Sequence, residues 1–193
     1  FIDAEKGTAS TRDDYHCWAA ASTNMLVWSG WAEKGNPAAT GTNAEDVIFS
    51  EVSSTFKTGT GSLLDPISWF FDKNYAKQYS ANSAAAGTGG YIGASASPGQ
   101  TYENVSGLAS MHNLADALDN NKAVGLFLSK TGGGHSVAVW GYTFDSTKAR
   151  TDPKYYTGLL ITCSDDNKNV KYGKAAVDRM NMISNTYDAT TNR

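Results

Sequence analysis

The segment 17–31 constrains the fold of this chain more than any other stretch. It begins Cys-Trp-Ala-Ala-Ala and continues with Met25, Leu26 and Trp28, a pattern typical of a helix that packs inside a domain. Cys17 stands at the first turn, where unpaired backbone N–H groups and the positive end of the helix dipole favour a thiolate. The thiolate is the nucleophilic form of cysteine, but an inert buried cysteine is also common. The segment therefore predicts a central helix with a candidate nucleophile at its N-terminal end.

The hydrophobic pattern of the rest of the chain predicts further helices and then a sheet. Apolar residues at helical spacing predict helices over 44–56, 62–74 and 108–121. Continuous and alternating apolar runs predict antiparallel strands over 123–128, 135–145, 155–163 and 170–177. A tight turn is expected at 131–134, a long loop at 80–100, and core contacts from Met180 and Ile183. We therefore expect residues 1–193 to form a single α+β domain with a helical first half and a sheet in the second half.

Charge and composition bear on the partners that the protein can have. Lys and Arg number 16 against 19 Asp and Glu, so the sequence predicts no basic face for nucleic-acid binding. No apolar run approaches the length of about 18 residues that a transmembrane helix needs. A composition rich in Gly, Ser, Thr, Asn and aromatic residues favours a secreted or cell-surface protein. The chain starts at Phe1 without Met, and we expect it to be a processed or truncated form.

Cys17, His135 and an acidic cluster after the predicted strand 155–163 form an ordered set of catalytic residue types. Cysteine-dependent peptide hydrolysis needs a thiolate that attacks the carbonyl, an imidazole that holds and returns the proton, and a carboxylate that orients the imidazole. His135 follows three glycines, which leave space beside its ring at the start of a strand. A nucleophile on a central helix and a base on a later strand is the papain-like arrangement.

Other interpretations of the cysteines and histidines compete with this one. His16 adjoins Cys17, but sequence neighbours at the start of a helix rarely direct their side chains at each other. His112 lies in a polar segment and is expected to be exposed. The two Cys and three His lack short metal-ligand spacings, so we expect neither a metal nor another cofactor. The sequence leaves open whether Cys17 and Cys163 form a disulfide or are free thiols.

Short motifs along the chain carry a resemblance to a known family. They are Asp3-Ala4-Glu5-Lys6, Asp13-Asp14-Tyr15-His16-Cys17, Asn24-Met25-Leu26 with Trp28, Gly125-Leu126, His135, Trp140-Gly141, Phe144-Asp145, Ile161-Thr162 and Ser164-Asp165. In this order they resemble motifs of the immunoglobulin-G-degrading cysteine endopeptidases of the IdeS/Mac type, which have a papain-like fold. The segment 35–100 has no counterpart and is shorter in this chain.

The resemblance implies roles for the residues that match the motifs. Cys17 corresponds to the nucleophile and His135 to the base. Lys6 corresponds to a lysine that helps to form the oxyanion site, together with the backbone N–H of Cys17. The distance in sequence between Lys6 and Cys17 is one residue longer than in the family.

The acidic corner departs from the family pattern. The family has Asp-Ser-Asp, and its first Asp orients the histidine, whereas this chain has Cys163-Ser164-Asp165. Asp165 is therefore expected to take the orienting role, with Asp166 as the next candidate. Alternatively the triad is weakened, because loss of the orienting carboxylate lowers the rate by several orders of magnitude.

The resemblance implies a secreted, monomeric thiol protease that acts on a protein substrate, with a host protein such as immunoglobulin as a candidate, and so a virulence factor. Specificity for immunoglobulin is not carried over, because the segments that correspond to the family's exosites are short or unmatched. Two alternatives remain. One is acyl transfer to an amine, as in transglutaminase-type toxins with the same triad. The other is a binding module that has lost activity, suggested by Cys163 at the position of a carboxylate.

Overall fold

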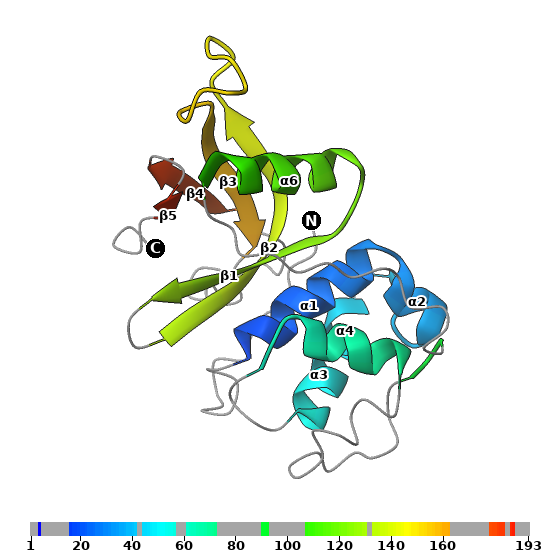
Figure 1. The fold of residues 1–193 in the computed structure, drawn as a ribbon. Helices are drawn as coiled ribbons and strands as arrows, with labels where there is room; N and C mark the ends of the chain where they lie inside the picture. The colour runs from blue at the N-terminus through cyan, green and yellow to red at the C-terminus, as the bar shows by residue number, and fades with distance from the viewer. Residues whose placement is uncertain are drawn as a thin grey trace.

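Helices form the first part of the chain in the computed structural model, which describes residues 4, 16–41, 44–56, 61–72, 90–92, 107–130, 133–162, 178–183 and 186–187. These helices are α1 (Cys17–Trp28), α2 (Trp31–Gly35), α3 (Ala44–Thr55) and α4 (Leu64–Phe71). They gather on one side of the molecule, with α1 nearest to the sheet (Figure 1). The predicted helices 17–31, 44–56 and 62–74 are thus present, with shorter bounds.

The central helix ends earlier than predicted because of Gly30. This residue has φ +76, in the left-handed region that favours glycine, and it precedes α2. Trp31, which was expected in the central helix, is therefore the first residue of a separate short helix. In α4, Pro66 lies in the first turn, where its missing N–H costs no helical hydrogen bond, as the sequence predicts.

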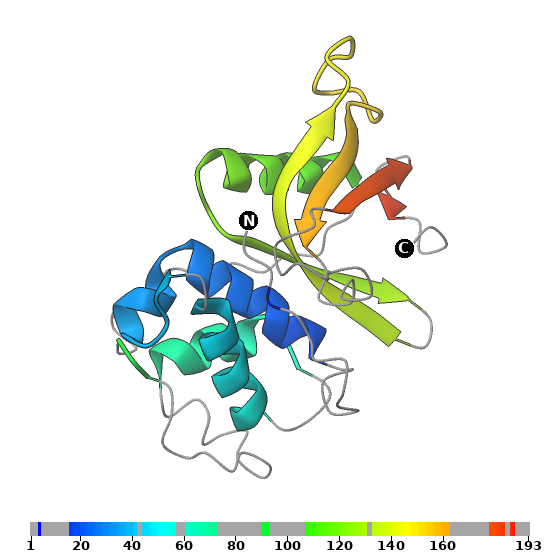
Figure 2. The same ribbon diagram turned by 180° about the vertical axis from the view of Figure 1, so that it is seen from behind.

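An antiparallel sheet lies in the second half of the chain, which confirms the predicted α+β arrangement. After α6 (Gly107–Asp119), the strands are β1 (Val124–Lys130), β2 (Gly133–Phe144), β3 (Tyr156–Thr162), β4 (Asp178–Ile183) and β5 (Thr186–Tyr187). They lie in sequence order across the sheet, each paired antiparallel with the next. Seen from behind, the sheet and α6 lie on one side of α1 and the other helices on the opposite side (Figure 2).

The start of β2 and the presence of β4 differ from the prediction. Strand β2 begins at Gly133, inside the predicted turn 131–134, because Gly133 and Gly134 pair with the end of β1. Residues 178–183, for which only core contacts were expected, form β4 on the far edge of β3. The strand predicted at 170–177 lies outside the described residues. The pairing of β4 with β3 depends on tertiary contacts more than on its own residue pattern, so the pattern missed β4.

Part of the predicted loop 80–100 packs on the helices. The N–H groups of Gly90 and Tyr91 donate to the carbonyl oxygens of Trp69 and Phe70, at 2.8 and 2.9 Å. The Tyr91 hydroxyl donates to Oε2 of Glu51 on α3. Residues 90–92 therefore tie α4 to α3, and the rest of the predicted loop lies outside the described residues.

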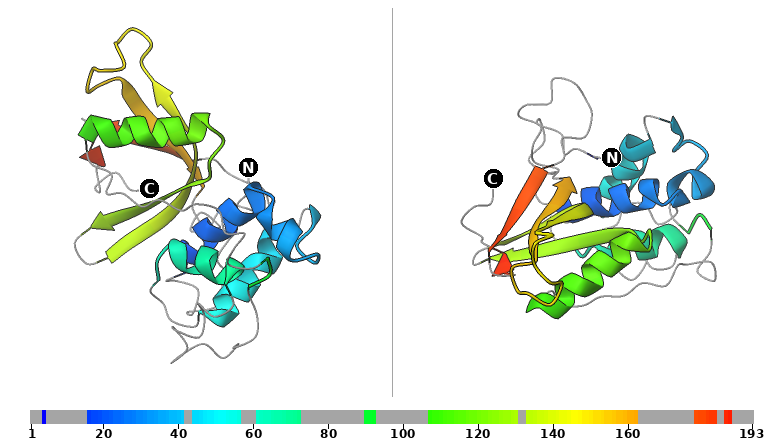
Figure 3. Two further views of the ribbon diagram at one scale, coloured as in Figure 1. Left: turned by 45° about the vertical axis from the view of Figure 1, so that its right-hand side comes forward. Right: turned by 90° about the horizontal axis from the view of Figure 1, so that it is seen from above.

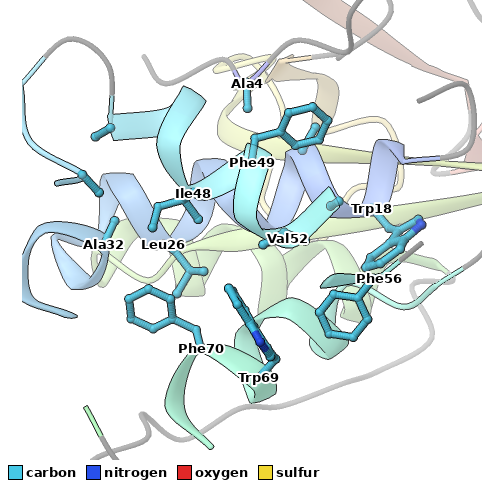
Figure 4. Close-up of a cluster of buried hydrophobic side chains, with 14 of the residues drawn as sticks. Ala4, Trp18, Leu26, Ala32, Ile48, Phe49, Val52, Phe56, Trp69 and Phe70 are labelled. Atoms are coloured by element: carbon cyan, nitrogen blue, oxygen red, sulfur yellow. The ribbon is translucent and has the colours of Figure 1, made fainter. Parts of the chain in front are cut away.

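The helical core is rich in aromatic side chains. Trp69 is fully buried at the centre, with ring centroids of Phe56 at 6.1 Å, Phe70 at 6.4 Å and Tyr91 at 5.8 Å. Figure 4 shows Trp69 and Phe70 of α4 facing side chains of α1 and α3. The rings meet mostly edge to face, an arrangement that adds to the stability gained from burial.

We expect Trp69→Ala to lower the free energy of unfolding by about 3–5 kcal/mol, because the surrounding rings cannot fill the cavity. The measurement is chemical denaturation followed by circular dichroism. Trp28→Ala is the matched control, since Trp28 is 41% exposed and its removal leaves no closed cavity. Equal losses in the two variants would contradict this account of the core.

A second core lies between the sheet and α6. Met111, Leu114 and Ala115 of α6 cover Val137 and Val139 of β2, and all five are buried. The opposite face of β2 meets α1, so the sheet lies between two layers of helices (Figure 3). None of the helices in the described part of the chain combines the length and apolarity needed to cross a membrane.

Candidate functional site

The C-terminal half of α1 is fixed against the sheet by specific contacts. The Asn24 Nδ2 donates a hydrogen bond of 3.2 Å to the hydroxyl of Thr162, the last residue of β3. One turn further along the helix, the ring of Trp28 lies 6.1 Å from the ring of Trp140 on β2. The two contacts set the position of α1 along the strands.

Cys17 lies on the same face of α1 as these contacts. Gly125 of β1 permits close approach, because a Cβ at this position would lie 2.8 Å from the Cε of Met25. Residues four apart on a helix share a face, so Ala21 and Cys17 continue the stripe that Met25 begins. Both are buried. Cys17 also belongs to the cluster of buried side chains in the helical core, so it lies where the helical core and the sheet side of α1 meet.

We compare the position of Cys17 along α1 with the position of His135 along β2. Thr162 pairs with Ala138, and Asn24 is hydrogen-bonded to Thr162. Asn24 therefore lies at the same position along the strands as Ala138. Cys17 comes seven residues before Asn24, which is about 10.5 Å along a helix. His135 comes three residues before Ala138, which is about 10 Å along a strand. Because α1 and β2 run in the same direction, we infer that Cys17 and His135 lie at the same level (Figure 1).

Cys17 is the first residue of α1 and carries a free thiol that is 8% exposed. The backbone N–H groups of this first turn have no acceptor within the helix, as at every helix start. The preceding residue, His16, is buried, and its ring meets the ring of Trp18 edge to face at 5.8 Å. The imidazole of His16 thus packs against the aromatic side of α1.

His135 is half-buried near the start of β2 and pairs with Leu128 of β1. Strand alternation sets it on the face of Val137 and Val139, which α6 covers, whereas α1 packs on the other face. The β1–β2 hairpin extends beyond α6 at this end (Figure 1). Contact between the imidazole and the Cys17 thiol therefore requires that the twist of β2 at its free end turns the ring toward α1.

The other predicted site residues lie outside the described residues: Lys6, Cys163, Asp165 and Asp166. Their chain neighbours Ala4 and Thr162 are described, and both are hydrogen-bonded to Asn24. Asn24 is thus a candidate site residue that the motif analysis recorded without assigning a role. Its signal in the sequence is an amide within an otherwise apolar and small-residue helix.

The described part of the candidate site contains one free thiol, that of Cys17. Among the residues that the structure describes, no three His, Cys, Asp or Glu side chains are grouped to hold a metal ion. No model of a known protein family matches the sequence, and a search of curated proteins finds no significant match. The candidate site consists of Cys17 at a helix start and His135, which we infer to lie at the same height along the sheet. It also includes Ala4 and Thr162, which are both hydrogen-bonded to Asn24 and precede Lys6 and Asp165 in the chain.

Proposed function

We propose that this protein is a secreted cysteine endopeptidase with a papain-like fold. The observation that supports it most is the contact of α1 with the sheet through Asn24 and Thr162, from which we infer that Cys17 and His135 lie at the same height along β2. A thiol at a helix start and an imidazole on the adjacent strand are the two groups that peptide cleavage through an acyl-enzyme needs.

The reaction proceeds in two halves. In the first, the Cys17 thiolate attacks the peptide carbonyl carbon, and the imidazolium of His135 gives its proton to the leaving amine. The amine departs and a thioester with Cys17 remains. In the second half, His135 takes a proton from water, which attacks the thioester and releases the carboxylic acid and the thiol. The N–H of Cys17 and the ammonium of Lys6 stabilise the oxyanion in both halves.

Asp165 is supported as the orienting acid by the register of β2 and β3. Ala138 pairs with Thr162, and each residue backwards along β2 faces one residue forwards along β3. If the ladder continues, Asp165 is opposite His135 on the same face of the sheet. Directly opposed residues have Cβ atoms about 5 Å apart. Asp166 would then be on the other face, which favours Asp165.

An alkylation experiment tests the pairing of Cys17 with His135. We expect His135→Ala to slow the reaction of Cys17 with iodoacetamide at neutral pH by about tenfold or more, because the imidazole no longer takes the thiol proton. Mass spectrometry of the labelled peptide gives the rate. His112→Ala is the matched control: His112 lies on α6, where its Nε2 is 2.9 Å from the carbonyl oxygen of Arg150. Equal rates in both variants would contradict the pairing.

A further inference from the structure

We propose that Asn24 is a positioning residue that fixes Ala4 and Thr162, the described residues nearest in the chain to Lys6 and Asp165, relative to α1. This inference rests on the proposed function. Asn24 is 2% exposed, and its amide serves two partners at once. Its Oδ1 accepts from the backbone N–H of Ala4 at 2.7 Å, and its Nδ2 donates to the hydroxyl of Thr162 at 3.2 Å. We call these two hydrogen bonds the Asn24 clamp.

The first bond of the clamp fixes Ala4. Ala4 is 1% exposed and belongs to the same core cluster as α1. Lys6 follows by two residues, so its Cα lies at most about 7 Å from the Cα of Ala4. The four-carbon stem of lysine extends that reach further.

The second bond of the clamp fixes the end of β3. The hydroxyl of Thr162 accepts from Asn24 and also from the indole Nε1 of Trp140, at 3.0 Å. The bond from Trp140 ties Thr162 to β2, the strand of His135. Asp165 follows Thr162 by three residues, at most about 11 Å away. The clamp thus joins α1, which carries Cys17, to the end of β3 and, through Trp140, to β2, which carries His135.

An amide at this place is a costly way to fill space. Burial of an amide is unfavourable unless its donor and acceptor are both used, and an apolar side chain of similar shape avoids that cost. The amide of Asn24 instead fixes relative position, because its two hydrogen bonds hold Ala4 and Thr162 in one geometry. Displacement of a catalytic group by about 1 Å lowers a rate by about 100-fold, so geometry of this kind matters more to catalysis than to packing.

Hydrogen exchange tests the clamp without reference to activity. In Asn24→Leu we expect faster exchange in peptides that cover residues 1–8 and 160–168, with little change in α3. Thr23→Val is the matched control: Thr23 is the adjacent residue of α1, it is fully buried, and its hydroxyl has no hydrogen-bond partner among the described residues. Unchanged exchange in the two segments of Asn24→Leu would overturn the clamp.

Kinetics with an unfolded protein substrate test the positioning role. We expect Asn24→Leu to lower kcat by about 100-fold with little change in KM, whereas Thr23→Val keeps the rate of the natural protein. Thr162→Val, which breaks one bond of the clamp, should lower kcat less, and Thr162→Ser should restore it. Loss of protection with unchanged kcat would overturn the positioning role. A natural protein without peptidase activity would instead overturn the proposed function, and the exchange experiment still decides the clamp.

Discussion

Cys17→Ala is expected to abolish peptide hydrolysis. The thiol is the only group in the proposed mechanism that forms a covalent bond to substrate, and loss of such a nucleophile lowers kcat by about 10⁶-fold in a well-studied protease. The fold should persist, because alanine fills most of the space of the cysteine on the buried stripe of α1. The measurement is release of fluorescent peptides from labelled casein, together with a thermal melt of the variant.

The second cysteine provides the control for this experiment. Cys163→Ser should keep most of the activity, because Cys163 is neither nucleophile nor base in the proposed mechanism. Iodoacetamide should inactivate Cys163→Ser and the natural protein alike. Full hydrolysis by Cys17→Ala would rule out Cys17 as the nucleophile. If an added amine takes the acyl group in preference to water, mass spectrometry of the products will identify a transferase.

Asp165→Asn is expected to lower kcat by about three to four orders of magnitude, the effect of losing the carboxylate that orients a catalytic histidine. An asparagine keeps the shape of the side chain but not its charge, so the loss reports on the support of the imidazolium. Full pH–rate profiles of the variant and the natural protein give the measurement.

Asp166→Asn is the matched control for this substitution. The two residues are neighbours, and a ladder that kept the register of β2 and β3 beyond Thr162 would put only Asp165 on the face of His135. We expect Asp166→Asn to keep activity within a few-fold of the natural protein, because Asp166 has no part in the proposed mechanism. The reverse result would mean that the ladder slips by one residue after Thr162, which would make Asp166 the orienting acid.

Much of the fold is predictable from the sequence because it depends on local signals. Apolar spacing predicts α3 and α4, and a run of small and apolar residues predicts α1. The end of α1 is harder to predict, because Gly30 allows either a stop or a single left-handed residue between two helices. Strand β4 is missed, since its pairing with β3 comes from tertiary contacts and not from its own pattern.

The candidate site is predictable only in part, for a similar reason. A cysteine at a helix start and a histidine after three glycines are visible in the sequence as local features. The alignment of α1 with β2 is not, because it depends on contacts between residues that are far apart in the chain, such as Asn24 and Thr162. The role of Asn24 follows only once both its partners are known, and one of them is a backbone N–H.

The burial of α1 on all sides has a consequence for how the molecule folds. Every residue from Cys17 to Leu26 is buried, with one side in the helical core and the other against the sheet. A helix without a polar face would expose apolar surface to water if either half were present alone. The helical half and the sheet half therefore complete each other through one shared element. We expect neither half, expressed alone, to remain soluble and folded, and the whole chain to unfold in a single transition.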